Sequence, residues 1–501
     1  MTTPTPPGTV APSVGDRATS GVFWLTAQKW TTRLLGFATI ALLTRLLSPE
    51  DFGTVAAAST VLPFFFLLAD LGFAAYLVQV KKADQRMLST AFWFSMIAGV
   101  VLCVVMFALA PLLGLLFRDD GVVPIIQGLS VWVILTAFGS VPMAILRRDM
   151  RFSVIATQGA VAAVVAQVVA VVLAFAGAGA WALVAQSLVA PAITSTLAWL
   201  TTRWHPSRTF VRGEFTTMLR FGSQVLGADF VAMLRALGEA AVISATLGVA
   251  ALGYMTIAQR LVQVVQDLTG SAIVPVTQVA FAKIREEPER LRAAYLRALR
   301  LTYFALALPL TFVAVGSPLI VPIMFGDGWE HSYPVAQILA IAGTLTVGAW
   351  LDHGLFFGLG RPGVWFWYAL VIDGLTLGVT VVLAPFGLVA IAWGFVGVCI
   401  VATVSRWFLT ARALRTRLRT VAGPFGFVAV VVLTSGTAGW LVMTATAGAP
   451  ALISLLLASL TVLLVHLAVT RLLAPRIIPD ALSMLARSKL GARLPLVRRF
   501  R

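Results

Sequence analysis

The stretch from residue 88 to residue 117 reads LSTAFWFSMIAGVVLCVVMFALAPLLGLLF, thirty residues without a single charge. A helix rises about 1.5 Å per residue, so a run of this length crosses the roughly 30 Å hydrocarbon core of a bilayer. The whole chain has the same character, because 59% of its 501 residues are hydrophobic, only 11% are charged and the mean hydropathy is +0.94. A water-soluble globule of this size needs more polar surface than that. The sequence therefore predicts an all-α polytopic membrane protein.

Similar apolar stretches recur along the chain and predict about fourteen transmembrane helices. We expect them near 21–46, 54–80, 88–117, 122–146, 153–177, 180–202, 219–247, 250–282, 301–325, 334–359, 363–384, 386–409, 423–443 and 450–470. Residues 1–20 are rich in Pro, Thr and Ser. This composition predicts a disordered tail rather than a cleavable signal peptide.

Basic residues gather in alternate loops between these stretches. With a cytoplasmic N-terminus, the inner loops hold clusters such as Lys81, Lys82 and Arg86, whereas acids such as Glu330 fall in the outer loops. Because cytoplasmic loops of membrane proteins are enriched in Lys and Arg, both termini are expected in the cytoplasm of a cell-membrane protein. This dispersal accounts for the net charge of +17 without a nucleic-acid partner. The basic tail 471–501 is expected to contact anionic membrane lipids.

Several enzyme and metal signatures do not occur in the sequence. It contains no Gly-Lys-Ser/Thr phosphate loop and no His-Glu-x-x-His pair. Cys103 and Cys399 each lie inside an apolar run, far apart in sequence, so neither a disulfide framework nor a metal site is predicted. We therefore expect no cofactor, no metal and no enzymatic activity. The short outer loops also weaken the alternative of a polysaccharide polymerase or ligase, which needs room for catalytic groups.

Basic side chains inside the apolar stretches are the main functional signal. Lys29 and Arg33 lie one helical turn apart in the first stretch, and Arg235 and Arg260 lie in later ones. A charge at membrane depth costs about 2.5 to 3.5 kcal/mol on insertion scales, so it persists where it faces a cavity, a partner or an anionic cargo. We predict that these four residues bind the negatively charged part of a substrate.

Acids in the apolar stretches leave a structural alternative open. They are as numerous as these bases, so internal ion pairs could neutralise the whole set; the acids are Asp70, Asp229, Glu239 and Asp267. Arg235 and Glu239 in particular are spaced for a pair on one helix face. Glutamines recur through spans five to eight, where their amides suit either sugar hydroxyls or contacts between helices.

Two further acids are candidates for ion coupling. Asp352 and Asp373 stand in the tenth and eleventh expected spans, with no Lys or Arg inside their own segments. An intramembrane carboxylate of this kind can bind a proton or sodium ion. The alternative is a neutral carboxylic acid that a neighbouring hydroxyl holds in place.

The chain also contains a weak internal repeat. Residues 47–54, LSPEDFGT, align with residues 247–254, LGVAALGY, after a shift of 200 positions. Six expected spans separate the two copies, which gives them the same orientation in the membrane. Parallel repeats of this kind occur in transporters that bind cargo between two halves.

One run of motifs resembles a known family. LTRLLSPEDFG at 43–53 is followed by LADLG at 68–72 and LSTAFW at 88–93. Together they resemble the N-terminal signature of Wzx-type polysaccharide flippases, whose superfamily includes multidrug and toxin extruders and the flippase of the peptidoglycan lipid precursor. Four residues of this signature are assigned structural roles: Glu50, Asp51, Gly53 and Asp70. For Asp70 we expect helix capping or pairing with Lys81 or Lys82.

The resemblance implies two pseudo-symmetric six-helix lobes and two added C-terminal helices. The corresponding segments are a tail at 1–20, lobes at 21–202 and 219–409 joined by a cytoplasmic linker at 203–218, extra helices at 410–470 and a basic tail at 471–501. It also implies alternating-access transport of polyprenyl-diphosphate-linked oligosaccharides, with a polysaccharide polymerase and glycosyltransferases as partners. The alternatives are a multidrug exporter of the same fold and a membrane enzyme of polysaccharide assembly.

Overall fold

The computed structural model describes residue 28, residues 31–80 and 83–475, and residues 477 and 479, without the side chains of 221–229 and 267–276. These residues form helices joined by short turns, and no strand occurs among them. Twelve described helices are long and apolar enough to cross a membrane. The all-α membrane fold class is therefore confirmed.

The expected count of fourteen spans stays a prediction. Of the two spans outside the twelve, 21–46 is described only in part, as the shorter apolar helix Thr31–Leu43. The other, 250–282, corresponds to the helix Val249–Lys283, which is long enough to cross but carries Arg260 and several glutamines among its apolar residues. Its length supports a span, while its composition is less apolar than that of the twelve.

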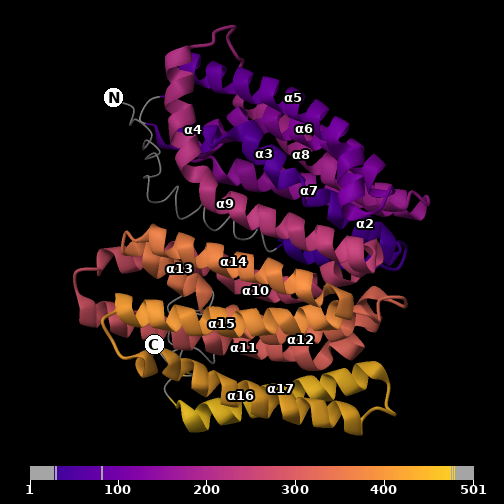
Figure 1. Cartoon of the computed structure of the whole chain (residues 1–501), viewed down its shortest axis with the longest axis vertical. Helices are drawn as coiled ribbons and strands as arrows, with labels where there is room; N and C mark the ends of the chain where they lie inside the picture. Colours follow the sequence, from indigo (N-terminus) through magenta and orange to yellow (C-terminus); the bar gives the residue numbers. More distant parts are fainter. Residues whose placement is uncertain (1–27, 29–30, 81–82, 476, 478, 480–501) are drawn as a thin grey trace, which may run out of the picture. The chain divides into compact units, whose positions relative to one another are not determined.

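Helix contacts divide the chain into two compact units. The first comprises Met1–Leu47 and Ala57–Met233, and the second comprises Ser48–Ala56 and Leu234–Arg501. The chain passes from the first unit to the second between Met233 and Leu234, inside α9 (Arg212–Leu247). The helices before α9 are α2 (Pro49–Ser59), α3 (Leu62–Asp70), α4 (Phe73–Gln79), α5 (Gln85–Phe117), α6 (Val122–Arg148), α7 (Phe152–Phe175) and α8 (Ala180–Thr202) (Figure 1).

The remaining helices all belong to the second unit. They are α10 (Val249–Lys283), α11 (Pro288–Phe325), α12 (Ser332–Thr346), α13 (Ala349–Gly358), α14 (Pro362–Leu383), α15 (Leu388–Ala413), α16 (Leu418–Ala445) and α17 (Ala451–Leu473), with a 3₁₀ turn at Ala384–Phe386. Helices α16 and α17 lie side by side and both pack against α11 (Figure 1). At the contact between α16 and α17, a Cβ added to Gly439 would collide with the Val462 side chain, 2.3 Å away. Small residues such as this glycine allow membrane helices to pack closely.

The expected span 54–80 is broken into α2, α3 and α4. Leu71 and Gly72 both have positive φ, 44° and 73°, and this left-handed turn ends α3 and starts α4. At the far end of α4 the Arg148 guanidinium donates to the carbonyls of Leu77 and Val80 at 2.9 and 2.7 Å. These bonds satisfy carbonyls that a helix end leaves without partners. A polar site therefore interrupts an otherwise apolar stretch.

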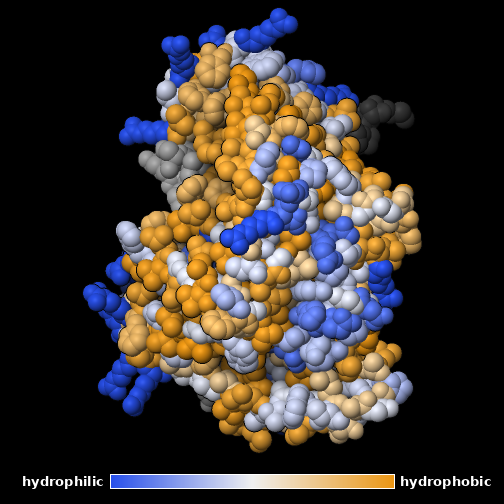
Figure 2. Space-filling view, turned by 45° about the vertical axis from the view of Figure 1, so that its right-hand side comes forward, coloured by the Kyte–Doolittle hydropathy of each residue, from blue (hydrophilic) through white to orange (hydrophobic). Residues whose placement is uncertain are grey.

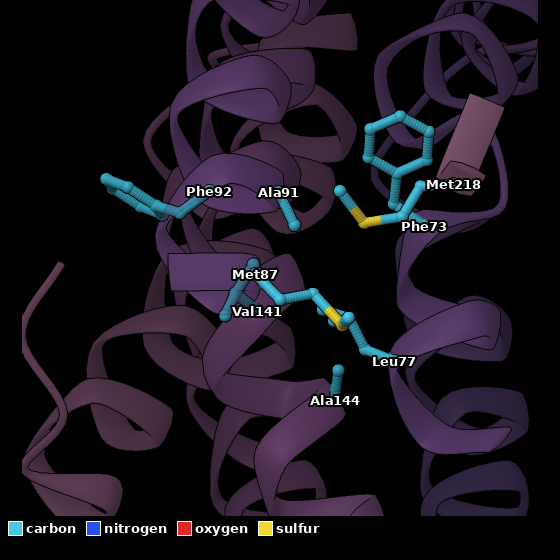
Figure 3. Packing of buried hydrophobic residues seen from close by; sticks show 8 residues of the cluster. All are labelled: Phe73, Leu77, Met87, Ala91, Phe92, Val141, Ala144 and Met218. Carbon is cyan, nitrogen blue, oxygen red and sulfur yellow. The ribbon is translucent and has the colours of Figure 1, made fainter. Parts of the chain in front are cut away.

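A cluster of buried apolar residues joins α4, α5, α6 and α9 in the first unit (Figure 3). Phe73 and Leu77 of α4 pack against Met87 of α5 and Met218 of α9. In a lipid environment such contacts stabilise chiefly through close packing, because lipid tails are as apolar as the side chains.

The loop before α9 is fixed to this cluster by side chains of α5. Trp93 Nε1 donates to the Ser207 carbonyl at 2.8 Å, and Gln85 Nε2 donates to the His205 carbonyl at 2.6 Å. The expected linker 203–218 thus contains both this anchored loop and the first turns of α9.

The two glycines of the internal repeat touch each other within the second unit. A Cβ added to Gly53 would lie 1.7 Å from the Val249 carbonyl oxygen, and one added to Gly253 would lie 2.1 Å from the Pro49 carbonyl oxygen. The first turns of α2 and α10 therefore cross in backbone contact, which only glycine permits. The Phe52 ring packs edge-on against buried Trp329 at 5.3 Å beside this crossing.

Much of the surface is apolar. Large hydrophobic side chains such as Leu115, Val382 and Leu433 are exposed. Figure 2 shows apolar residues over much of the visible face, with hydrophilic residues in separate patches. Such extensive exposure is stable only where lipid covers the side chains.

Candidate functional site

The second unit holds an open cavity of about 570 Å³, and charged and amide side chains lie on its largely apolar wall. Helices α9, α10, α12, α14 and α15 supply its walls, together with the start of α13. The polar side chains that line it are Arg235, Glu239, Gln259, Gln263, Gln266, Thr346, Tyr368, Asp373, Thr376 and Arg406. A volume of this size suits part of a small-molecule ligand.

Arg235 contacts two carboxylates on the cavity wall. Its Nη1 donates to Glu239 Oε1 at 2.7 Å, one turn further along α9, and its Nε lies 2.9 Å from Asp373 Oδ1 on α14. The side chain of Arg235 is 30% exposed, and those of Glu239 and Asp373 are 12% and 22% exposed. The pairing of Arg235 with Glu239 is the structural alternative that their spacing left open, and Asp373 joins it from a different helix.

Arg406 and Asp352 form a second ion pair that is sealed from solvent. Arg406 Nη1 donates to Asp352 Oδ2 at 2.9 Å, and the two side chains are only 3% and 4% exposed. Asp352 Oδ1 also accepts bonds from the Tyr295 and Thr410 hydroxyls at 2.6 and 2.8 Å. This network ties α11, α13 and α15 together, with Arg406 forming part of the cavity wall.

Sequence reasoning missed the role of Arg406. The structure buries this residue inside α15. Two signals pointed to the pair: Arg406 falls inside the expected span 386–409, and Asp352 lacks a base in its own span. Which span supplies the partner depends on helix packing, which the sequence does not show.

Three glutamines of α10 line the same cavity as these charges. Gln259, Gln263 and Gln266 are spaced so that they share one helix face. Gly343 on α12 gives Gln266 room, because a Cβ there would lie 3.1 Å from the Gln266 amide nitrogen. Amides can donate and accept hydrogen bonds at once, as sugar hydroxyls require.

Two other bases predicted to bind substrate, Arg33 and Arg260, lie outside this cavity. Arg260 is exposed on α10 and does not line this cavity, and Arg33 is half-buried in the helix Thr31–Leu43 of the first unit. Lys29 lies outside the described residues. The assignment of these residues to substrate binding stays a prediction.

The first unit holds a smaller polar cavity of about 170 Å³ beside the broken span. Asp70 faces it from the end of α3 and accepts a hydrogen bond from the Ser140 hydroxyl at 2.8 Å. Arg147 and Thr194 line the same cavity. The carboxylate of Asp70 thus has a hydroxyl partner on α6.

The remaining signature residues build the start of α2. The Ser48 hydroxyl and backbone N–H both donate to Asp51 Oδ2 at 3.0 Å, while the Asp51 N–H donates to the Ser48 hydroxyl at 3.1 Å. This reciprocal pattern is a capping box, and Glu50 and Asp51 place negative charge at the positive end of the helix dipole. Gly53 then makes the backbone crossing with α10.

Comparisons with known proteins agree with this architecture. Residues 42–334 match the family model described as polysaccharide biosynthesis protein. The chain is 26% identical to the succinoglycan biosynthesis transport protein ExoT of Rhizobium meliloti (strain 1021), over 72% of this chain and 73% of that protein. It is 24% identical to the lipopolysaccharide biosynthesis protein WzxC of Escherichia coli (strain K12), over 79% and 81%. The teichuronic acid biosynthesis protein TuaB of Bacillus subtilis (strain 168) is also 24% identical, over 79% and 83%.

Solved structures show the same fold at low sequence identity. The lipid II flippase MurJ in an inward closed conformation aligns with a TM-score of 0.73 and 12% identity, over 91% of this chain and 99% of that one. An inward-facing multidrug resistance MATE family transporter of the MOP superfamily aligns with a TM-score of 0.62 and 17% identity, over 77% and 95%. The resemblance to Wzx-type proteins of this superfamily is confirmed, and the chain belongs to the polysaccharide biosynthesis protein family.

Proposed function

We propose that this protein is a flippase that moves polyprenyl-diphosphate-linked oligosaccharides across the cytoplasmic membrane by alternating access, for cell-surface polysaccharide synthesis. The observation that carries the proposal is the cavity in the second unit, which combines cavity-facing Arg235 with three glutamines. A guanidinium suits a diphosphate, and the amides suit the sugar hydroxyls. The names of the relatives, which include a transport protein for a polysaccharide, support the same substrate class.

The remaining site assignments belong to this proposal. Lys29, Arg33 and Arg260 extend the basic surface for the diphosphate, and Asp373 binds the coupling ion, a proton or sodium. For Asp352 we propose the structural role, because three donors already engage its carboxylate. No covalent step is part of the transport cycle, so the protein acts on its substrate without being an enzyme.

The proposed placement in the cell follows from the charge distribution. Both termini lie in the cytoplasm, with two six-helix lobes at 21–202 and 219–409 and two further helices at 410–470. The loop at 203–218 and the tails at 1–20 and 471–501 then face the cytoplasm, beside the glycosyltransferases that complete the cargo. A polysaccharide polymerase receives the cargo on the outer side.

A reconstituted flipping assay tests the proposal. The purified protein is placed in liposomes that contain a prenyl-diphosphate oligosaccharide, and a membrane-impermeant lectin reports the fraction of sugar on each side. We expect wild-type protein to equilibrate the cargo between leaflets, and Arg235→Gln and Arg33→Gln to slow this by at least about tenfold, the factor that corresponds to about 1.4 kcal/mol.

Arg290→Gln is the matched control, because Arg290 pairs with Glu287 on the surface at 67% exposure, outside the cavity. It should flip cargo at the wild-type rate. If wild-type protein does not flip the cargo, the proposed function is wrong. If the same liposomes instead export a cationic dye, the protein is a multidrug exporter.

A further inference from the structure

Arg235 contacts more carboxylates than a site that only binds an anion requires. One guanidinium contacts two carboxylates, Glu239 on its own helix and Asp373 on α14, so the cluster has one positive and two negative formal charges. Arg406, which also lines the cavity, contacts a single carboxylate, and its side chain is only 3% exposed. The cluster at Arg235 is partly exposed to the cavity and therefore open to exchange of partners.

The geometry of the guanidinium makes the carboxylates competitors of any bound phosphate. Arginine binds phosphate best with two parallel N–H groups, and its fork geometry offers Nε with Nη2 or Nη1 with Nη2. Asp373 already contacts Nε, and Glu239 already accepts from Nη1. A carboxylate oxygen therefore lies beside one nitrogen of each fork, hydrogen-bonded at Nη1 and in charge contact without a hydrogen bond at Nε, so a bidentate phosphate competes with one of the two carboxylates.

We infer that Glu239 and Asp373 are release residues, which compete with the cargo's phosphate for Arg235 and return to it when the cargo leaves. This inference rests on the proposed function. A transport site must bind well enough to load and weakly enough to unload, and two internal anions beside the binding cation hold the affinity down. The empty site never leaves Arg235 as an unpaired charge at membrane depth, which is costly.

The surrounding groups do not take over this role. Tyr368 and Cys399 line the same cavity as neutral groups, and Arg406 is engaged by Asp352. The glutamines of α10 carry no charge and suit the sugar. Among the described residues of the cavity wall, Glu239 and Asp373 are the acids that reach Arg235.

Binding of a short probe to purified, full-length protein tests the inference. The probe is a synthetic citronellyl-diphosphate-N-acetylglucosamine, which is soluble and carries the diphosphate and one sugar. Each of Glu239→Gln and Asp373→Asn should tighten its Kd roughly tenfold, or about 1.4 kcal/mol, because one competitor is removed. Each should also slow dissociation of the probe. Glu287→Gln, which alters a surface carboxylate paired with Arg290, should change neither quantity.

The possible outcomes separate the inference from the proposed function. If Arg235→Gln binds the probe as wild type does, the assignment of the cavity to cargo fails. If Arg235→Gln loses binding but the two carboxylate variants bind equally well or more weakly, the competition is wrong and the acids hold Arg235 or the sugar in place. The two acids lie on different helices, so if one variant fails to fold, the other still decides the question.

Discussion

Arg235 and Arg406 show how burial separates two uses of the same residue type. Arg406 and Asp352 are almost completely buried and are held by hydroxyls and a backbone carbonyl as well as by each other. Arg235 faces the cavity, its side chain is 30% exposed, and it contacts carboxylates from two helices. The sequence placed Arg235 and Glu239 on one helix face, because their spacing shows this directly. It did not show that Asp373 contacts Arg235 or that Arg406 contacts Asp352, because these contacts depend on how the helices are rotated against each other.

This difference predicts opposite effects of two similar substitutions. Asp352→Asn leaves the Arg406 charge buried without a counter-ion, which in proteins destabilises by about 3–5 kcal/mol. We expect a much lower unfolding midpoint in detergent for this variant. Asp373→Asn should unfold close to wild type, because Arg235 keeps Glu239, and it should instead change the dependence of flipping on the proton or sodium gradient.

Thermal unfolding of the two purified variants, followed by flipping with and without an ionophore, checks the prediction. Thr376→Val, which alters a neutral residue of the cavity wall, is the control for cavity polarity. Equal unfolding midpoints for Asp352→Asn and wild type would contradict a structural role for the buried pair. A response of Asp373→Asn to ionophore that matches wild type would remove Asp373 from ion coupling.

Individual helices followed the apolar pattern of the sequence closely in some places and not in others. The stretch expected at 180–202 is α8, Ala180–Thr202, because apolar length alone determines such a span. The stretch expected at 54–80 is instead divided at Leu71 and Gly72, and the one at 334–359 is divided into α12 and α13. Positive φ at two residues makes the first break, whereas Val347 and Gly348 at the second break keep α-helical dihedrals; both breaks are short and leave almost no trace in hydropathy.

Because α2 and α10 cross in backbone contact, we expect the two glycines at the crossing to tolerate no larger residue. Gly53→Ala and Gly253→Ala each place a methyl group within 1.7 to 2.1 Å of a carbonyl oxygen, so the helices must separate. Overpacking of this kind costs about 1–3 kcal/mol or more. We expect little monodisperse protein by fluorescence-detected size-exclusion chromatography.

Gly397→Ala is the matched control for the crossing, because a Cβ at that position meets nothing within 4 Å and it lies in the middle of α15. It should be recovered like wild type. Normal recovery of both crossing variants would show that the two helices separate without loss of structure.

The molecule as a whole is a membrane transporter fold whose charge pattern predicts its orientation. The helices and the apolar surface were readable from composition, because lipid exposure sets the same requirement on every span. The site was readable only in part, since its residues come from six helices. The positive-inside rule predicts that Glu330 lies outside and Arg290 inside.

Labelling of single cysteines tests this orientation in a background without Cys103 and Cys399. A cysteine at Glu330 should react with a membrane-impermeant maleimide in intact cells, while one at Arg290 should react only after the membrane is opened. Both positions lie outside the helix cores at the surface, so access rather than burial decides the result. Labelling of Arg290→Cys from outside would reverse the proposed topology.

The contact between Gly53 and Gly253 has a genetic consequence. A side chain at either position collides with the main chain of the other helix, and no mutation can delete a main chain. Second-site suppressors of Gly53→Ala should therefore be absent from the facing positions 249 and 253. They should arise at positions where a substitution shifts a whole helix. The same suppressors should therefore rescue Gly53→Ala and Gly253→Ala, although the two sites lie 200 residues apart.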